Sequence, residues 1–228
     1  MYLRKVTYQL GRRIKSLVPC FHKSQVENLV LLVAGIASSR SVSLPRAAES
    51  APYKGIQIES RVARFERLLA CDKFDPLSTL KPVAKQVLKE VSRHGRQALT
   101  VVMDRSMIND TLNLLWVAVA YEGRALPLGW VQVPHEGNSN LEQQQRLLRW
   151  LKQCLPPGAE VTIVADREFH SIYLAGWIDQ SLHLSFILRI KAGTWVEVGG
   201  AWHRAGELAR RGCLLSYESV NVTQSPFR

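Results

Sequence analysis

The chain lacks the features of a zinc-binding, disulfide-rich or membrane-spanning protein. Its four cysteines lie far apart, and no C-x-x-C pair indicates a zinc knuckle or a disulfide framework. The apolar run over residues 29–37 is too short for a bilayer span, which needs roughly 20 apolar residues. The basic stretch before this run, and Glu27 beside it, also fit a signal peptide poorly. We therefore expect a cytosolic protein with reduced thiols.

Acidic residues are scarce, and this scarcity is the strongest signal in the composition. The 228 residues include 19 Asp and Glu against 30 Lys and Arg, which gives a net charge of +11. The first acid is Glu27, and it follows six basic residues, Arg4, Lys5, Arg12, Arg13, Lys15 and Lys23. Such a balance favours a polyanionic partner, nucleic acid first and an anionic membrane surface second. The alternative is a basic but merely solvated surface.

The first 94 residues have the periodicity of helices. The apolar stretch over residues 26–37 predicts a buried helix, and Pro45 is suited to open another. Apolar residues then recur with helical spacing at Ile58, Val62, Phe65 and Leu69. A further helix is expected to begin with Ser78 or Thr79 as its N-cap and to end at Gly95. We expect residues 1–94 to form an all-helical basic domain, either a DNA-binding unit or a bundle with a polar exterior.

After Gly95 the pattern changes to apolar runs of strand length. They cover residues 97–103, 112–121, 125–133 and 160–165, and the turn Glu122-Gly123 joins the second and third as a hairpin. Helices are expected over residues 141–151 and 174–178, followed by a half-exposed edge strand over residues 182–191. This order predicts a mixed α/β sheet in which the first strand and the strand after the crossover are neighbours.

Two of these runs are followed directly by an aspartate: Asp104 comes after the first run and Asp166 after the fourth. Neighbouring strands would bring the two carboxylates together at the carboxyl edge of the sheet, where ligands collect in such folds. One or two carboxylates with phosphate oxygens and water are the usual ligands of Mg2+, and a two-metal version catalyses phosphodiester transfer. The alternative is that each aspartate begins a turn or caps a helix, as Asp166 before Arg167-Glu168-Phe169 is placed to do.

Five motifs in register give the chain a specific resemblance. They are Asp104-Arg-Ser-Met-Ile-Asn, the hairpin Tyr121-Glu-Gly-Arg-Ala-Leu-Pro-Leu-Gly-Trp130, Gly137-Asn-Ser-Asn140, Ala165-Asp-Arg-Glu-Phe169 and Leu188-Arg-Ile-Lys191. Together they resemble the core of bacterial insertion-sequence transposases of the DDE type, from about residue 97 to residue 191. The resemblance implies a ribonuclease-H-like mixed sheet flanked by helices over residues 95–192. The helical domain would precede this core, and residues 193–228 would begin a β-rich insertion.

The resemblance also implies the functional residues. Asp104 and Asp166 would be the first and second catalytic acids and would bind Mg2+ or Mn2+. Phosphate contacts would come from Arg105, Arg167, Arg189 and Lys191, although exposed charges beside a strand are the alternative. Asn138 and Asn140 would contact DNA or serve as turn residues. The partner would be double-stranded DNA, at transposon ends and at the target, in the bacterial cytoplasm and nucleoid. A homo-oligomer is compatible with the resemblance, and no membrane partner is expected.

The third acid of the family pattern is missing. The family places its glutamate on a helix, after a tyrosine, two residues, an arginine and three residues. Only Tyr121 has an arginine three residues on, and Leu128 stands where the glutamate belongs. Glu197, Glu207 and Glu218 lie in the tail without the right surroundings. We therefore expect a C-terminally truncated transposase that is inactive alone. The alternatives are a non-catalytic DNA-binding protein, an inhibitor of the full-length transposase, or a remnant that does not fold stably.

Overall fold

The protein forms two compact units, Met1–Val83 and Ala84–Arg228. The computed structural model describes residues 2–18, 21–52, 55–71, 75–109, 112–134, 137–218 and 220–223. The predicted features at Cys20 and in residues 224–228, and the side chains of Arg4 and Lys5, lie outside the described part. The boundary between the two units falls inside one helix, α5 (Pro76–Val91).

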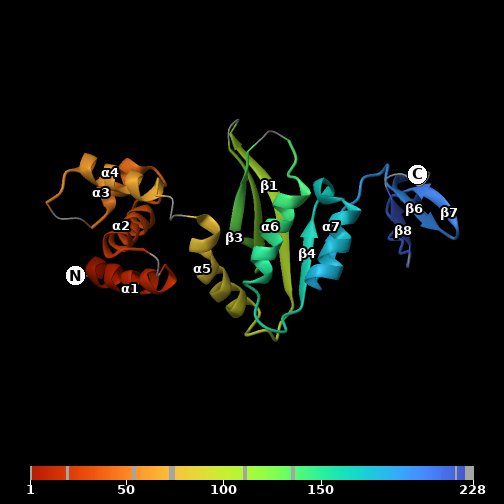
Figure 1. The fold of residues 1–228 in the computed structure, drawn as a ribbon, viewed down its shortest axis with the longest axis horizontal. Coiled ribbons are helices and arrows are strands. Elements are labelled where there is room, and N and C mark those ends of the chain that lie inside the picture. The colour runs from red at the N-terminus through yellow and green to blue at the C-terminus, as the bar shows by residue number, and fades with distance from the viewer. Residues whose placement is uncertain are drawn as a thin grey trace. The chain divides into compact units, whose positions relative to one another are not determined.

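The first unit is all-helical, as the periodicity predicts. It contains α1 (Tyr2–Leu17), α2 (Lys23–Ser39), α3 (Leu44–Ser50) and α4 (Ile58–Leu69) (Figure 1). Pro45 lies in the first turn of α3, where its missing N–H leaves no hydrogen bond unmade. The core consists of buried apolar side chains from all four helices, among them Ile14, Val30, Ala47, Phe65 and Leu68. The predicted helices over residues 26–37 and 56–69 are confirmed.

Helices α2 and α3 pack so closely that one position tolerates no side chain. A Cβ atom built on Gly35 would overlap the carbonyl oxygen of Ala47 and would lie 2.9 Å from its carbonyl carbon. Ala47 is itself fully buried. The obstacle is backbone, which a small side-chain rearrangement cannot move away. Gly35 therefore allows α3 to cross over α2.

No single helix in the described ranges has the length and apolar composition of a membrane span. Helices α2 and α3 meet the criterion only as a pair, and this pair is bent by 95°.

Helix α5 begins earlier than the sequence pattern indicates. Asp75 precedes it, and its Oδ2 accepts a hydrogen bond of 2.7 Å from the backbone N–H of Ser78. The predicted start at Ser78 or Thr79 is therefore wrong, because a carboxylate caps the helix and Pro76 occupies its first position. Pro82 consequently lies inside the helix rather than in its first turn. The helix ends at Val91, and Gly95 follows in a turn with φ of +85°.

The second unit is built on a five-stranded mixed sheet flanked by helices. Its strands are β1 (Leu99–Asn109), β2 (Leu112–Tyr121), β3 (Arg124–Val133), β4 (Val161–Ala165) and β5 (Ser185–Leu188). They lie in the order β3-β2-β1-β4-β5. The pairs β1–β2 and β2–β3 are antiparallel, whereas β1–β4 and β4–β5 are parallel. The predicted mixed α/β sheet, with the first strand beside the strand after the crossover, is confirmed.

Local sequence explains the connections of this sheet. Glu122 and Gly123 both have positive φ, 48° and 74°, as a two-residue hairpin turn between twisted strands requires. Helix α6 (Leu141–Lys152) packs against β2 and β3 and contacts α7 (Ile172–Trp177) (Figure 1). A π-helical turn, Ile178–Leu182, follows α7 and leads to the edge strand β5. That strand is shorter than the predicted residues 182–191.

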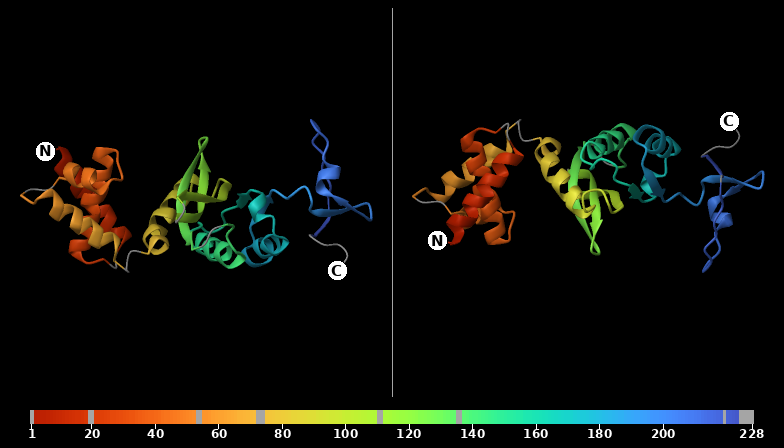
Figure 2. Two further views of the ribbon diagram at one scale, coloured as in Figure 1. Left: turned by 90° about the horizontal axis from the view of Figure 1, so that it is seen from above. Right: turned by 90° about the horizontal axis from the view of Figure 1, so that it is seen from below.

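A second, smaller sheet follows in the sequence, within the residues for which the resemblance implies a β-rich segment. It consists of β6 (Trp195–Val198), β7 (Ala201–Arg204) and β8 (Asn221–Thr223), in the antiparallel order β7-β6-β8 (Figure 2). Gly199 and Gly200 form the turn between β6 and β7, both with positive φ. The short helix α8 (Ala205–Leu208) follows β7 directly.

We predict that Gly35→Ala destabilises the helical unit by roughly 1–3 kcal/mol, because the added methyl group forces α2 and α3 apart. Gly11→Ala in α1 is the matched control, since its Cβ would meet only the Val30 side chain, at 3.7 Å. This control is expected to gain up to about 1 kcal/mol from helix propensity. Urea unfolding followed by circular dichroism compares the two. Equal stability of both variants would contradict the close crossing.

Candidate active site

The parallel pairing of β1 and β4 brings Asp104 and Asp166 side by side. The ladder runs from Leu99↔Val161 to Met103↔Ala165. Asp104 follows Met103 directly, and Asp166 follows Ala165 directly. Neighbouring strands lie about 4.8 Å apart, which is close enough for two carboxylates to bind one cation. The sequence predicts that the first strand lies beside the strand after the crossover. Strands β1 and β4 are those two strands, and their pairing places the acids together at the carboxyl end of the parallel ladder.

The prediction that the first strand ends at Asp104 is wrong. Strand β1 continues to Asn109, and Asp104 pairs with Trp116 of β2. The apolar run ends at Met103, at the last pair of the β1–β4 ladder, and beyond this point β1 pairs with β2. Asp104 thus lies inside a strand but at the end of the parallel ladder, whereas Asp166 lies in the turn that follows its strand.

The two aspartates share one face of the sheet. Side chains alternate along a strand, so Asp104 lies on the face of Val102, opposite the buried Val101 and Met103. Val102 pairs with Val164 of β4, and both are only partly buried. Asp104 is partly buried and Asp166 is exposed, so solvent and a ligand can reach both carboxylates.

Each carboxylate accepts, through one oxygen, a hydrogen bond from a backbone N–H one or two residues later. Asp104 Oδ1 accepts the backbone N–H of Arg105 at 2.8 Å, and Asp166 Oδ1 accepts that of Glu168, also at 2.8 Å. The second bond caps the short 3₁₀ helix Arg167–Phe169, so the capping alternative is confirmed for that oxygen. Among the residues that the structure describes, neither Oδ2 has a hydrogen-bond partner, and no basic side chain lies within 4.0 Å of either aspartate.

This donor set fits a hard divalent cation in part. Two accessible carboxylate oxygens on one face are the ligands that Mg2+ and Mn2+ take from a protein, with water and phosphate oxygens completing the shell. Within the described ranges, no group of three or more His, Cys, Asp or Glu residues is placed to bind a metal ion. The protein would therefore supply a minority of the ligands.

Arg105 is engaged in an ion pair. Its Nε donates to Oε1 and Oε2 of Glu168, both at 2.8 Å, and the two side chains are only 18% and 14% exposed. By strand alternation, Arg105 lies on the face opposite Asp104. Its place in this pair, rather than at the surface, counts against the predicted phosphate contact. Sequence reasoning included Glu168 in a motif but gave it no role.

A set of buried polar side chains surrounds this ion pair. Glu168 Oε1 also accepts from the backbone N–H and Oγ of Ser139, at 3.3 and 3.4 Å. Gln144 Nε2 donates to Ser139 Oγ at 3.1 Å. On the other side, Arg105 Nη1 donates to Asn113 Oδ1 at 3.2 Å, and Asn113 Nδ2 donates to the carbonyl of Gly137 at 3.1 Å. The network thus joins β1, β2, α6 and the loop before α6 to Glu168.

Three further basic residues predicted to contact phosphate are exposed: Arg167, Arg189 and Lys191. Arg167 follows Asp166 directly. Arg189 follows the last pair of the β4–β5 ladder, Ala165↔Leu188, so it lies beside Asp166 in register. The sheet edge therefore carries Asp104, Asp166 and Arg189 in a row across three parallel strands. Lys191 lies two residues beyond Arg189.

Asn140 has a structural role that the sequence left open. It is the N-cap of α6, and its Oδ1 accepts the N–H of Gln143 at 2.9 Å, while the Gln143 side chain accepts the N–H of Asn140. This reciprocal pair is a capping box. Asn138, two residues earlier, is exposed. Turn chemistry therefore accounts for Asn140 without any contact to DNA.

The three glutamates of the tail have partners or positions within the region of the small sheet. Glu197 accepts a hydrogen bond from Asn221 at 2.7 Å, and Glu207 accepts the N–H of Arg204 at 3.0 Å as part of a capping box. Glu218 is exposed. Glu207 lies in the short helix α8, but none of the three glutamates has the tyrosine–arginine surroundings that the family pattern requires.

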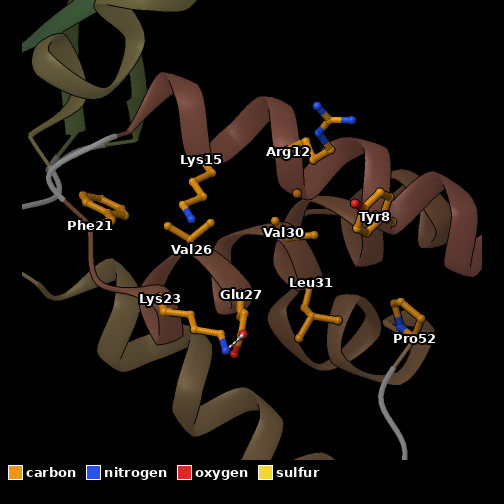
Figure 3. A pocket seen from close by; sticks show the side chains of 11 residues that line it. Tyr8, Arg12, Lys15, Phe21, Lys23, Val26, Glu27, Val30, Leu31 and Pro52 are labelled. Atoms are coloured by element: carbon orange, nitrogen blue, oxygen red, sulfur yellow. Dashed lines mark ion pairs between the residues drawn. The ribbon is translucent and has the colours of Figure 1, made fainter.

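Among its described residues, the helical unit contains a larger and a smaller hollow. The larger, of about 700 Å³, has an apolar floor that includes Val26 and Val30, with Arg12 and Lys15 at its border (Figure 3). In Figure 3 the Lys15 side chain points toward Val26, whereas Arg12 points away. The smaller, of about 490 Å³, is polar and lies between α2 and α4. Its lining includes Ser24, Gln25, Asn28, Arg64 and Arg67.

Comparison with models of known protein families, and with curated protein sequences, finds no match to this chain.

We predict that Asn140→Ala lowers the free energy of unfolding by about 1 kcal/mol, because α6 loses its N-cap. Asn138→Ala is the matched control and is expected to change it by less than about 0.5 kcal/mol. Both variants should bind duplex DNA like the unmodified chain at a temperature where they are folded. Unchanged stability with weakened DNA binding in Asn140→Ala would instead favour a direct contact of Asn140 with DNA.

Proposed function

We propose that this chain is a DNA-binding protein of the DDE transposase type, with a ribonuclease-H-like core that holds Mg2+ or Mn2+ at Asp104 and Asp166. The observation that carries this proposal is the end of the β1–β4 ladder, where the two acids are adjacent and share the less buried face. No arginine within 4.0 Å neutralises either of them among the described residues. The mixed five-stranded sheet is compatible with the fold that the resemblance implies.

The chemistry of this edge suits a phosphodiester substrate. A divalent cation bound there would polarise a phosphate oxygen and lower the negative charge that an attacking oxygen meets. Arg167 and Arg189 are exposed beside the acids and would position the DNA backbone without reading its sequence. Because phosphoryl transfer depends on position and charge, both the acids and the basic residues belong to one functional unit.

The chain alone is expected not to cleave DNA. Its sequence contains no tyrosine, arginine and glutamate in the arrangement that supplies the third acid. With only two carboxylates, the metal would lack a protein ligand that the family reaction requires, and loss of a ligand disturbs both geometry and rate.

A second candidate function needs no catalysis. Residues 1–83 contain 14 Lys and Arg against 6 Asp and Glu, so the helical unit is strongly basic. In this reading the chain occupies transposon ends or inhibits a full-length transposase by assembling with it. The polar hollow between α2 and α4 is a specific candidate for a phosphate contact, because Arg64 and Arg67 line it together with Ser24. Arg61 is less suited, since two of its nitrogens donate to the carbonyls of Ile56 and Ala48, whereas Arg67 donates its Nε to the carbonyl of Ala63.

We predict that the chain binds duplex DNA of arbitrary sequence with an affinity that falls steeply as salt rises. A plot of log affinity against log salt concentration has a negative slope. Replacing Arg64 and Arg67 by Gln should make this slope shallower by about two, one for each lost phosphate contact. Replacing Arg210 and Arg211, which are exposed in the tail, is the control for net charge and should leave the slope nearly unchanged. Fluorescence anisotropy measures both. Equal slopes in the two double variants would place the DNA contact elsewhere.

We also predict that the chain binds Mn2+ and that Asp104→Asn abolishes this binding while leaving duplex DNA affinity in metal-free buffer intact. Calorimetric titration measures the metal, and nicking of supercoiled plasmid in Mg2+ or Mn2+ measures the activity. We expect no nicking above the level of Asp104→Ala. Unchanged Mn2+ binding in Asp104→Asn would refute the metal site. Nicking that Asp104→Ala removes would instead show that the two acids suffice.

A further inference from the structure

The backbone hydrogen bonds of the sheet bring the two aspartates side by side, but they do not by themselves orient the two carboxylates. The parallel ladder ends at Met103 and Ala165, one residue before each acid. From there β1 continues along β2, whereas the segment after β4 turns into the 3₁₀ helix Arg167–Phe169. Side-chain contacts beyond the ladder therefore bear on how the two carboxylates are oriented and separated.

Arg105 and Glu168 form a link of this kind. The backbone N–H of Arg105 donates to Asp104 Oδ1, and the backbone N–H of Glu168 donates to Asp166 Oδ1, each at 2.8 Å. The side chains of the same two residues are joined through Arg105 Nε and both Glu168 oxygens. Each aspartate is thus bonded to one member of the ion pair, and the pair closes the connection between them.

The surroundings hold this pair in one geometry. Its side chains are 18% and 14% exposed, and Ser139 and Asn113, which bond to it, are 8% and 4% exposed. A buried ion pair contributes little to stability on average, because both charges lose their hydration. What such a pair can provide is a fixed arrangement of its two side chains, because each hydrogen bond within the network has a preferred direction.

The pair also leaves the acids free to act as ligands. Strand alternation places Arg105 on the face opposite Asp104, so its positive charge is paired with Glu168 instead of with Asp104. Residues that orient metal ligands from outside the coordination shell commonly change metal affinity by tenfold or more when replaced.

We propose that Arg105 and Glu168 are positioning residues of the two-aspartate site, which hold Asp104 and Asp166 at the separation that binds a divalent cation. This inference rests on the proposed function, because it assumes that the two acids bind metal. It assigns to Glu168 a role that does not include contact with the metal or the substrate.

The test is Mn2+ titration of the full chain by calorimetry, with the melting temperature of each variant measured in metal-free buffer. Glu168→Gln is expected to weaken Mn2+ binding by about tenfold to hundredfold. Glu160→Gln makes the same change at an exposed position just before β4 and should leave the affinity unchanged. Glu168→Asp keeps the charge and should retain most of the affinity, which provides a second variant if Glu168→Gln does not fold.

Two further variants test whether the pair acts as a unit. Arg105→Gln alone, and Arg105→Gln combined with Glu168→Gln, should each weaken Mn2+ binding about as much as Glu168→Gln does. A melting temperature that falls while the Mn2+ affinity of the folded protein stays constant would overturn the inference, because the pair would then be structural only.

The outcomes separate this inference from the proposed function. If Asp104→Asn abolishes Mn2+ binding and Glu168→Gln leaves it unchanged, the metal site stands and the positioning role is refuted. If the unmodified chain binds no Mn2+, both are refuted.

Discussion

The parallel pairing of β1 with β4 is the constraint on which the candidate site depends. It brings together two segments that are 62 positions apart in the sequence, and it ends one residue before each aspartate. The place where this ladder stops sets which residues of the two segments come next to each other. Apolar side chains fill the ladder on the covered face, whereas polar side chains begin at its end, because β1 there has a partner on one side only.

The two faces of the sheet divide the tasks at this edge. The less buried face presents Asp104 and Asp166 to solvent, with Arg189 next in the row. On the opposite face, Arg105 and Glu168 belong to a network of largely buried polar side chains that also includes Asn113, Ser139 and Gln144. Strand alternation produces this division on β1, since Asp104 and Arg105 are consecutive and point to opposite sides. On the other segment the 3₁₀ helix Arg167–Phe169 carries Glu168 to its contact with Arg105.

Much of this arrangement could be predicted from the sequence. Continuous apolar runs identify four of the strands, and Glu122-Gly123 identifies the hairpin turn, because both signals are local. The end of β1 could not be predicted from an apolar run, since Asp104, Arg105 and Ser106 are polar although they pair with β2. The start of α5 was missed because Asp75 rather than Ser78 caps it. Glu168 was overlooked, although an arginine after the first acid and a glutamate two residues after the second are a visible signal.

The backbone hydrogen bonds of the two aspartates leave Oδ2 of each side chain as the oxygen without a hydrogen-bond partner among the described residues. Oδ1 keeps a further lone pair but already accepts a backbone N–H, so the two Oδ2 atoms are the ligands that the site offers most readily. Two oxygens fill only a small part of an octahedral shell. The remaining positions would belong to water until a nucleic acid phosphate displaces it, so occupancy by metal and by DNA would rise together.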